Sequence, residues 1–286
     1  MNPMASKKKK AEEIKELTPE EQHQQDLERL EKLRPMDDTF MRELFRNDKK
    51  LAQFVLRIIT GIKDLKLTSE ETQYDLQHLF GARSICLDVF AVDKLGRIYN
   101  LEVQRADSGA SLQRVRYHAG ALAVELLPTN QDFSELPITY VIFITENDVR
   151  GKGLPLHHIA RYDYTAGEPV DDGEHIIFVN GAYQNKSDKS KLAKLIHDFN
   201  CSDPDEMYLP KIAEKTRYYK RTPEGVSRMC KLMEDMRNET TMREKIQTAL
   251  RMLAKGKYSL EEIAEISELS LRDVQELADK HNFVAA

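Results

Sequence analysis

The fold of this chain depends on the stretch SICLDVFAVDKLGRIYNLEVQ, which runs from Ser84 to Gln104. Two runs rich in β-branched and aromatic residues flank a short polar turn with a glycine, which is typical of a β-hairpin. The first run has two mostly apolar faces, one with Ile85, Leu87, Val89 and Ala91 and the other with Cys86, Asp88, Phe90 and Val92. We therefore expect a central strand that is covered on both sides, in which Asp88 is largely buried.

The length of the turn decides whether Asp88 meets Glu102, the acidic residue of the second run. A three-residue loop over 94–96 with a left-handed glycine is a common hairpin type, and it would pair Asp93 with Arg97. Asp88 would then lie directly opposite Glu102, with Cβ atoms roughly 4.5–5.5 Å apart. A two-residue loop would instead place the two acids on opposite faces of the hairpin. Both loops are open at this point, and we favour the first.

In the favoured register, one face of the hairpin presents Asp88, Glu102 and Gln104 together. A buried carboxylate needs a partner, a proton or a metal. Two carboxylates at this distance repel each other unless a cation lies between them. Ligands that are all oxygen favour Mg²⁺ or Mn²⁺ over zinc, so we expect a site for one of these ions.

Length and composition limit the class of protein. At 286 residues, the chain can bury a substantial core and form one or two domains. The net charge of −5 is no overall nucleic-acid signature, so any DNA contact must be local. No apolar run approaches the roughly 20 residues of a membrane helix, and no apolar stretch follows the lysines at 7–10. The three cysteines are unpaired in spacing, which favours the cytoplasm over a disulfide framework or a zinc site.

Periodicity predicts the order of the elements around the hairpin. Expected are a helix over 37–61 capped by Asp37 or Asp38 and ended by Gly61, a strand over 65–80, a helix over 106–127 capped by Asp107 or Ser108, and a buried strand over 138–145. Strands over 159–164 and 175–179 extend the sheet, and helices follow over 189–200, 207–220 and 223–247. The tail over 257–281 resembles a minimal helix-turn-helix, but its second helix is net acidic, which favours packing or protein contact over reading DNA sequence.

The chain thus divides into four predicted units. Residues 1–34 are a polar, basic N-terminal tail that leads into a solvated helix, 35–185 the core with its sheet extension, 186–250 a helical extension and 251–286 the small tail. Basic and aromatic residues gather in the helical extension, namely Lys211, Lys215, Arg217, Tyr218, Tyr219, Lys220 and Arg221. Backbone phosphates favour such a patch, so it is a candidate for DNA contact.

Several pieces of sequence occur in an order that resembles a known family. They are Pro35-Met36-Asp37-Asp38-Thr39-Phe40, Leu87-Asp88-Val89, Leu101-Glu102-Val103-Gln104, the segment from Arg114 to Tyr117 and Tyr140-Val141-Ile142-Phe143-Ile144. Over roughly residues 34–238 the set resembles the PD-(D/E)XK nucleases, and more narrowly the nuclease family transposases related to recombination-promoting nucleases. The resemblance implies an α/β fold with a restriction-endonuclease-like core of helix, three-stranded meander, helix and strand, followed by a helical C-terminal extension.

The resemblance also implies roles for particular residues. Asp88, Glu102 and Gln104 would be catalytic, with Asp88 and Glu102 as metal ligands and Gln104 where the superfamily usually has Lys. Auxiliary or phosphate-binding roles fall to Asp38, Arg105, Arg114 and Tyr117. Glu43 lies one turn after Asp38, and for both residues a helix cap or a solvated face is the alternative. The chain would then be a Mg²⁺- or Mn²⁺-dependent DNA endonuclease that serves transposition or recombination, with a homo-oligomer left open.

Two other functions stay open. A nuclease-fold protein could bind DNA or a protein partner without cutting, and both Gln104 and the acidic tail favour that alternative. An unrelated α/β protein could carry Asp88 and Glu102 for structure alone. In that case the two carboxylates should point apart or be held by Arg or Lys.

Overall fold

A mixed six-stranded sheet forms the centre of the computed structural model, which describes residues 17–76, 85–105, 107–281 and 283. The sheet order is β1 (Leu67–Leu76), β2 (Ile85–Asp93), β3 (Ile98–Gln104), β4 (Thr139–Thr145), β8 (Glu174–Asn180) and β5 (Leu156–Ile159). The β1–β2–β3 meander is antiparallel, whereas β4 runs parallel to both of its neighbours, β3 and β8. A parallel β3–β4 pair needs a crossover, and the helix between these two strands provides it.

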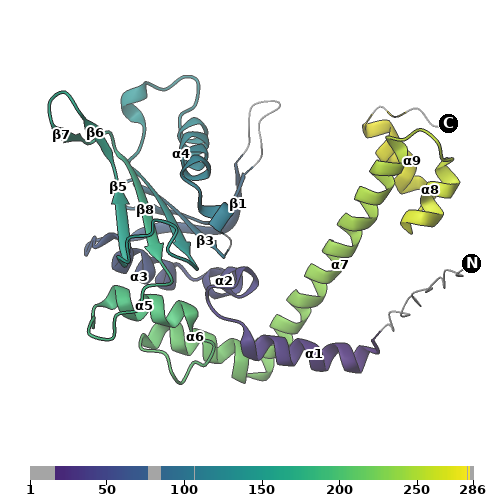
Figure 1. The fold of residues 1–286 in the computed structure, drawn as a ribbon, viewed down its shortest axis with the longest axis horizontal. Helices are drawn as coiled ribbons and strands as arrows, with labels where there is room; N and C mark the ends of the chain where they lie inside the picture. The colour runs from purple at the N-terminus through teal and green to yellow at the C-terminus, as the bar shows by residue number, and fades with distance from the viewer. Residues whose placement is uncertain (1–16, 77–84, 106, 282, 284–286) are drawn as a thin grey trace, which may run out of the picture.

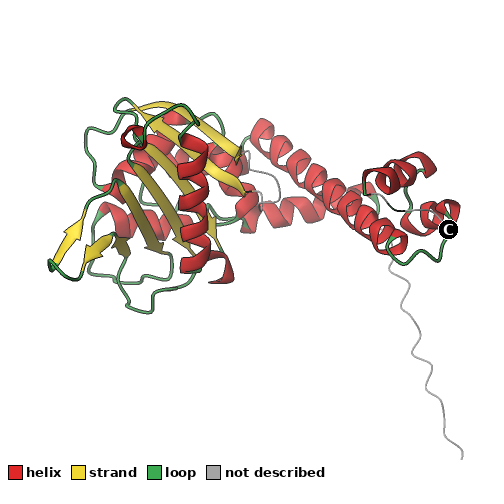
Figure 2. Ribbon diagram, turned by 90° about the horizontal axis from the view of Figure 1, so that it is seen from above, coloured by secondary structure: helices red, strands yellow, loops and turns green. Residues whose placement is uncertain are grey.

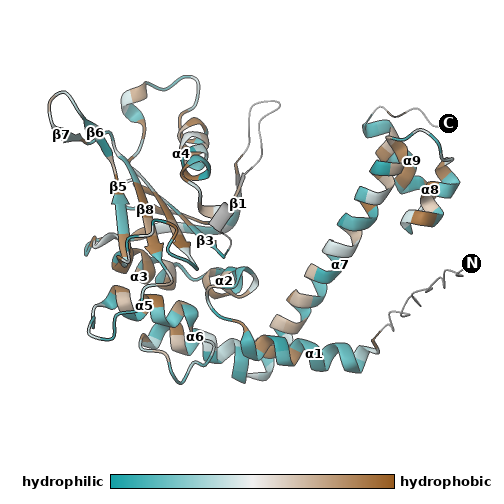
Figure 3. Cartoon of the chain, in the orientation of Figure 1, coloured by the Kyte–Doolittle hydropathy of each residue, from teal (hydrophilic) through white to brown (hydrophobic). Residues whose placement is uncertain are grey.

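Helices cover both faces of the sheet (Figures 1 and 2). Helix α4 (Leu112–Leu126) covers one face, and α2 (Asp38–Phe45), α3 (Lys49–Thr60) and α5 (Lys191–Asn200) cover the other, with α6 (Pro210–Arg221) beside them. Each face has its own hydrophobic core, and the apolar colouring of the strands in Figure 3 matches this burial. The arrangement is the restriction-endonuclease-like α/β core that the sequence predicted.

The β2–β3 hairpin has the three-residue loop that we favoured. Gly96 is left-handed with φ +75°, and the backbone N–H of Asp93 donates to the carbonyl of Arg97 at 3.0 Å. The carboxylate of Asp93 closes the loop, because it accepts hydrogen bonds from the N–H groups of Leu95 and Arg97, from the Arg97 guanidinium and from the Tyr99 hydroxyl. The register Val89 to Leu101, continued by one residue, places Asp88 opposite Glu102.

One prediction about the faces of β2 was wrong. Leu87 packs into the core on the α4 side, whereas Val89 and Ala91 belong to the opposite core. The alternation breaks at Asp88, which faces Gln73 of β1 in the pairing of these two strands. Gln73 has a φ of +61°, a left-handed conformation that interrupts the regular pleat at this point.

The predicted helix over 37–61 is two helices. Asn47 has a φ of +54°, and the Asp48 side chain accepts a hydrogen bond from the N–H of Leu51 at 3.0 Å, which starts α3. The predicted end at Gly61 is confirmed, because this residue is left-handed with φ +73°. In the next helix the cap is Ser111 rather than Asp107 or Ser108, because residues 107–110 form the separate 3₁₀ turn η1 (Asp107–Ala110).

Smaller elements also differ in part from the prediction. Strand β8 extends the main sheet as expected. The strand predicted over 159–164 does not: most of it is β6 (Arg161–Asp163), which pairs with β7 (Glu168–Val170) in a separate two-stranded sheet, and the strand that extends the main sheet is the earlier β5. A short 3₁₀ turn, η2 (Phe133–Glu135), precedes β4. The predicted first strand over 65–80 is confirmed as β1, and its last four positions, 77–80, lie outside the described residues.

Long helices extend from the core (Figure 2). Helix α7 (Pro223–Leu253) continues beyond its predicted end at 247, and α1 (Pro19–Lys32) packs along it. Most residues of α1 are exposed, as expected for a solvated helix, but Asp26 and Leu30 are buried. The Arg237 guanidinium binds both carboxylate oxygens of Asp26, at 2.6 and 3.0 Å, which joins the two helices.

The C-terminal tail has the two predicted helices, α8 (Leu260–Ser267) and α9 (Leu271–Lys280), and the expected capping box at Ser259 and Glu262. They pack on the end of α7 around a third hydrophobic core, visible as a second apolar region in Figure 3. The division of the chain into four units stays a prediction. Among the helices described here, none is both long and apolar enough to span a bilayer.

Candidate active site

A cavity of about 520 Å³ lies beside the end of the β2–β3 hairpin. Its lining comes from six parts of the chain: Asp38 and Arg42 of α2, Gln73 of β1, Cys86 and Asp88 of β2, Glu102 to Arg105 at the end of β3, Arg114 of α4, and Glu239 and Arg243 of α7. The cavity therefore brings together all of the predicted site residues except Tyr117, which is not part of the lining.

Asp88 and Glu102 hold each other in place across the hairpin. The backbone N–H of Val103 donates to Oδ2 of Asp88 at 3.1 Å, and the N–H of Asp88 donates to Oε1 of Glu102 at 3.3 Å. The two side chains are nearly buried, with Asp88 8% and Glu102 1% exposed. Each carboxylate is thus held by one backbone N–H of the other strand, and both side chains line the cavity.

The protonation of this acid pair is strongly perturbed. Burial raises the pKa of Asp88 to about 6, with a further increase from the charge of Asp38, while the Val103 N–H, Arg42 and Arg114 oppose the rise. Burial and the neighbouring Asp88 charge raise the pKa of Glu102 well above its usual range. Burial thus disfavours both charges and the Asp88 charge further disfavours that of Glu102, which is the situation that a bound cation relieves.

The donor set of the acid pair fits a hard divalent cation. The described residues contain no group of three or more His, Cys, Asp or Glu side chains placed to hold a metal ion, so a protein-only cage such as zinc requires is not visible among them. Mg²⁺ usually keeps several waters and is bound through one or two carboxylates together with substrate phosphates. Two carboxylate oxygens facing a polar cavity match that kind of ion.

Gln104 is positioned by the turn that follows β3. Gly109, in η1, lies so close to Gln104 that a Cβ at position 109 would collide with Oε1 of this side chain. The absence of a side chain at 109 therefore lets the Gln104 amide lie against η1, at the rim of the cavity. An amide offers both a donor and an acceptor, but no positive charge.

The four arginines of the cavity fall into two groups. Arg42 binds Asp38 through two nitrogens, at 3.0 and 2.9 Å. Arg105 binds Asp37 at 2.9 Å and Glu146 at 3.0 Å, so its charge is already compensated. In contrast, Arg114 and Arg243 have no carboxylate within ion-pair distance among the described residues.

Helix α4 adds a residue that the sequence did not suggest. His118 is buried one turn after Arg114, with its Nδ1 3.9 Å from Oε1 of Glu102 and its ring edge-on to Phe143. Burial, helped by the charge of Arg114, lowers the pKa of His118 to about 4, so the imidazole is neutral at pH 7. A helical spacing of four residues from Arg114 was the one available signal, and it is weak.

Other unpredicted residues carried even less signal. Arg42 follows Asp38 by four residues, a spacing that suggests an ion pair on a helix but not a site. Glu239 and Arg243 lie far along the chain from the hairpin, in a long charged helix with no motif of its own. Only the three-dimensional structure brings them to the cavity.

Glu43 and the basic patch of the helical extension, which the sequence also suggested, do not line the cavity. Glu43 is neither a cap nor solvated: it is 2% exposed and forms ion pairs with Arg46 at 2.8 Å and Arg228 at 2.6 Å, away from the cavity. The basic residues of the helical extension are also mostly engaged. Lys215 pairs with Asp48, Arg217 with Asp205 and Arg221 with Glu31, while Lys220 is buried and donates to the carbonyls of Glu31 and Ser202. This patch therefore has little free charge for phosphates.

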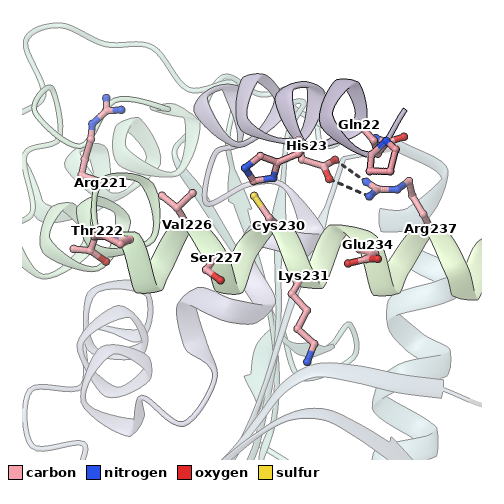
Figure 4. Close-up of a pocket in the computed structure, with 13 residues that line it drawn as sticks. Gln22, His23, Arg221, Thr222, Val226, Ser227, Cys230, Lys231, Glu234 and Arg237 are labelled. Carbon is pink, nitrogen blue, oxygen red and sulfur yellow. Dashed lines mark hydrogen bonds and ion pairs between the residues drawn. The ribbon is translucent and has the colours of Figure 1, made fainter. Parts of the chain in front are cut away.

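A larger cavity, of about 830 Å³, lies between α1 and α7 (Figure 4). His23, Cys230, Lys231 and Glu234 line it, and its one buried carboxylate, Asp26, is bound by Arg237. The other lining carboxylate, Glu234, is exposed, so among the described residues this cavity lacks the pair of buried, unbound acids that the hairpin site has.

Comparison with known proteins agrees with the geometry. The family model described as PD-(D/E)XK nuclease family transposase matches residues 38–263, from Asp38 at the cavity to α8 in the tail. No curated protein matches the chain, and no solved structure does. The family match covers most of the sequence and contains the whole meander with its acid pair. This chain therefore belongs to the PD-(D/E)XK nuclease family transposases.

Proposed function

We propose that this protein is a metal-dependent DNA endonuclease that hydrolyses phosphodiester bonds, with Asp88 and Glu102 as ligands of Mg²⁺ or Mn²⁺. One observation carries the proposal. Two buried carboxylates lie side by side at a polar cavity and have no arginine or lysine within ion-pair distance among the described residues. A purely structural pair would be expected to point apart or to be neutralised by a cationic side chain.

The residues of the cavity would divide the work as follows. A divalent ion bound there supplies positive charge to the phosphate and lowers the pKa of a water. Asp88 and Glu102 would hold that ion, and the Val103 and Asp88 N–H groups fix the two carboxylates before substrate arrives. Gln104 orients a water through its amide, since it cannot supply the charge of the usual lysine.

Positive charge near the scissile phosphate would come from Arg114. Its guanidinium lines the cavity and is near enough to lower the pKa of both Asp88 and Glu102. Arg105 is a weaker candidate than we expected, because Asp37 and Glu146 already bind it. Asp38 would act through Arg42, which it holds at the cavity wall. The family points to transposition or recombination as the process that this cleavage serves.

The test is cleavage of supercoiled plasmid with Mg²⁺ or Mn²⁺, run beside EDTA and beside Asp88→Ala and Glu102→Ala. We expect metal-dependent cutting that EDTA and both substitutions abolish, while circular dichroism shows a folded protein. Glu70→Gln is the matched control, because Glu70 is a partly buried carboxylate of β1 that does not line the cavity. Cutting by a clean preparation of Asp88→Ala would overturn the assignment.

Gln104 supports a second candidate, a protein of this fold that binds DNA without cutting it. The superfamily position that usually adds positive charge is neutral here, which lowers the expected rate. If no metal supports cutting by the wild type while duplex DNA still binds, this second function replaces the first. A Gln104→Lys variant that gained cutting would then identify the missing group.

A further inference from the structure

Helix α7 supplies a wall of the cavity although it lies outside the α/β core. Glu239 and Arg243 are on this helix, and both line the cavity that contains Asp88 and Glu102. Figure 1 shows α7 rising from the region of α1 and α6 towards α8 and α9, on the side of the molecule where β1 and β3 end. A groove that leads to the acid pair is therefore bordered by a helix far along the chain.

The position of α7 is set by specific contacts. Met229 and Met233 are buried in the main core, and the Thr39 hydroxyl donates to Sδ of Met236 at 3.1 Å. Thr39 follows Asp38 on α2, so this contact anchors α7 next to the cavity and about one turn before Glu239. The Asp26–Arg237 ion pair holds the same turn from the other side.

The charges on this wall are not used within the described structure. Arg243 is exposed and has no ion pair with any described carboxylate, including Glu239 four residues before it on the same helix. Arg42 and Arg105, in contrast, are bound by carboxylates. Arg114 and Arg243 are thus the two cavity arginines whose charge is available, and they come from two different helices.

We infer that α7 forms one side of the DNA-binding groove and that Arg243 binds a backbone phosphate on the strand leading to the acid pair. The inference rests on the proposed function, which supplies the DNA. A guanidinium binds phosphate oxygens through two parallel hydrogen bonds, so a free arginine at the rim of a polar cavity suits this ligand. Glu239 lies on the same wall and repels phosphate. The DNA backbone should therefore contact this wall at Arg243 and stay away from the turn of α7 that carries Glu239.

The experiment measures binding apart from cutting. Fluorescence anisotropy of a labelled duplex is recorded with Asp88→Asn protein at several salt concentrations, alone and combined with further substitutions. Arg243→Gln should weaken binding about tenfold, the size of one charge-assisted contact. It should also reduce the slope of log affinity against log salt by about 0.9, the value for one phosphate. Glu239→Gln should tighten binding, because it removes a repelling charge.

Arg251→Gln is the matched control for an arginine on the same helix. Arg251 is exposed near the end of α7, contacts Gln247 and does not line the cavity. We expect its affinity and salt slope to equal those of the parent. An equal salt slope for Arg243→Gln and the parent would overturn the inference, even if the wild type binds and cuts DNA. Absence of both binding and cutting by the wild type would instead overturn the proposed function itself.

Discussion

Glu102 and Glu43 are both almost fully buried, yet the charges around them differ. Glu43 of α2 is held by two arginines, Arg46 and Arg228. Glu102 of β3 faces another carboxylate, Asp88, and the neutral imidazole of His118. Burial is therefore not what separates a structural acid from a candidate site in this protein. The two acids differ instead in whether a cationic side chain of the described residues binds them.

Other buried acids of the chain resemble Glu43 rather than Glu102. Asp93 is bound by Arg97 and Tyr99, and Asp26 is bound by Arg237. Asp198 is fully buried, accepts hydrogen bonds from the N–H groups of Tyr208 and Leu209, and lies 3.0 Å from Nδ1 of His197. These described acids are compensated by other groups of the chain, whereas the Asp88–Glu102 pair is one that an external cation would complete.

The strongest way to test this comparison is to remove one acid of the uncompensated pair. Asp88→Asn should lower the cleavage rate by about a thousandfold or more, which is about 4 kcal/mol of transition-state stabilisation. Stability should not fall, because the substitution removes a charge that burial and Asp38 disfavour. The measurements are plasmid cleavage kinetics and urea denaturation of the same preparations. A large loss of stability would place Asp88 with the structural acids instead.

The opposite result is expected for the compensated acid. Glu43→Ala leaves Arg46 and Arg228 without their shared partner and should lower the free energy of unfolding by about 2 kcal/mol. Cleavage by the folded fraction should stay near the wild-type rate, because Glu43 does not line the cavity. Urea denaturation measures the first effect and cleavage at a low temperature the second. A specific loss of cleavage with unchanged stability would contradict the contrast.

Metal addition sharpens the comparison without using activity. A ligand that binds only the folded state stabilises it by about 2.7 kcal/mol at 100 times its dissociation constant. Mg²⁺ or Mn²⁺ should therefore raise the melting temperature of the wild type and of Glu43→Gln. The same ions should leave Asp88→Asn and Glu102→Gln much less affected. Equal shifts in all four proteins would mean that the ion binds elsewhere.

The smallest predicted effect tests whether a raised pKa by itself identifies a catalytic site. Burial, with help from Asp48 and Glu71, raises the pKa of Glu70 to about 7, and its Oε1 has no hydrogen-bond partner among the described residues. The unfolded chain loses this proton at lower pH, so the contribution of Glu70 to stability is complete below pH 4.5 and is lost as the pH rises through about 7.

Glu70→Gln should remove this pH dependence. The variant should melt at a higher temperature than the wild type at pH 8 and at the same temperature at pH 4. Its cleavage rate should be unchanged, because one isolated acid outside the cavity is not a metal site. Thermal melts at the two pH values check the first statement. If cleavage were lost as well, the perturbed pKa alone would have been the better guide to function.

Much of the fold could be predicted from the sequence because it depends on local features of the chain. Gly96 and the lengths of the two apolar runs determine the turn, and Gly61 determines the end of α3 through its left-handed conformation. The near-continuous apolar run over 138–145 predicted a buried strand, and β4 is such a strand. The prediction was wrong where one backbone angle overrides the periodicity of the sequence. Asn47 divides the first predicted helix, and Gln73 changes the face on which Leu87 lies.

The sequence by itself limited Asp88 and Glu102 to two registers and favoured the one in which they meet, because strand pairing next to a short turn follows from counting residues. The structure has that register. Only the tertiary structure decided which charges near them are free. It binds Arg105 to Asp37 and Glu146, buries His118 beside Glu102, and brings Arg243 to the cavity from a distant helix. Register is a short-range property of the backbone, whereas the partner of a long charged side chain depends on which elements the packed core places beside it.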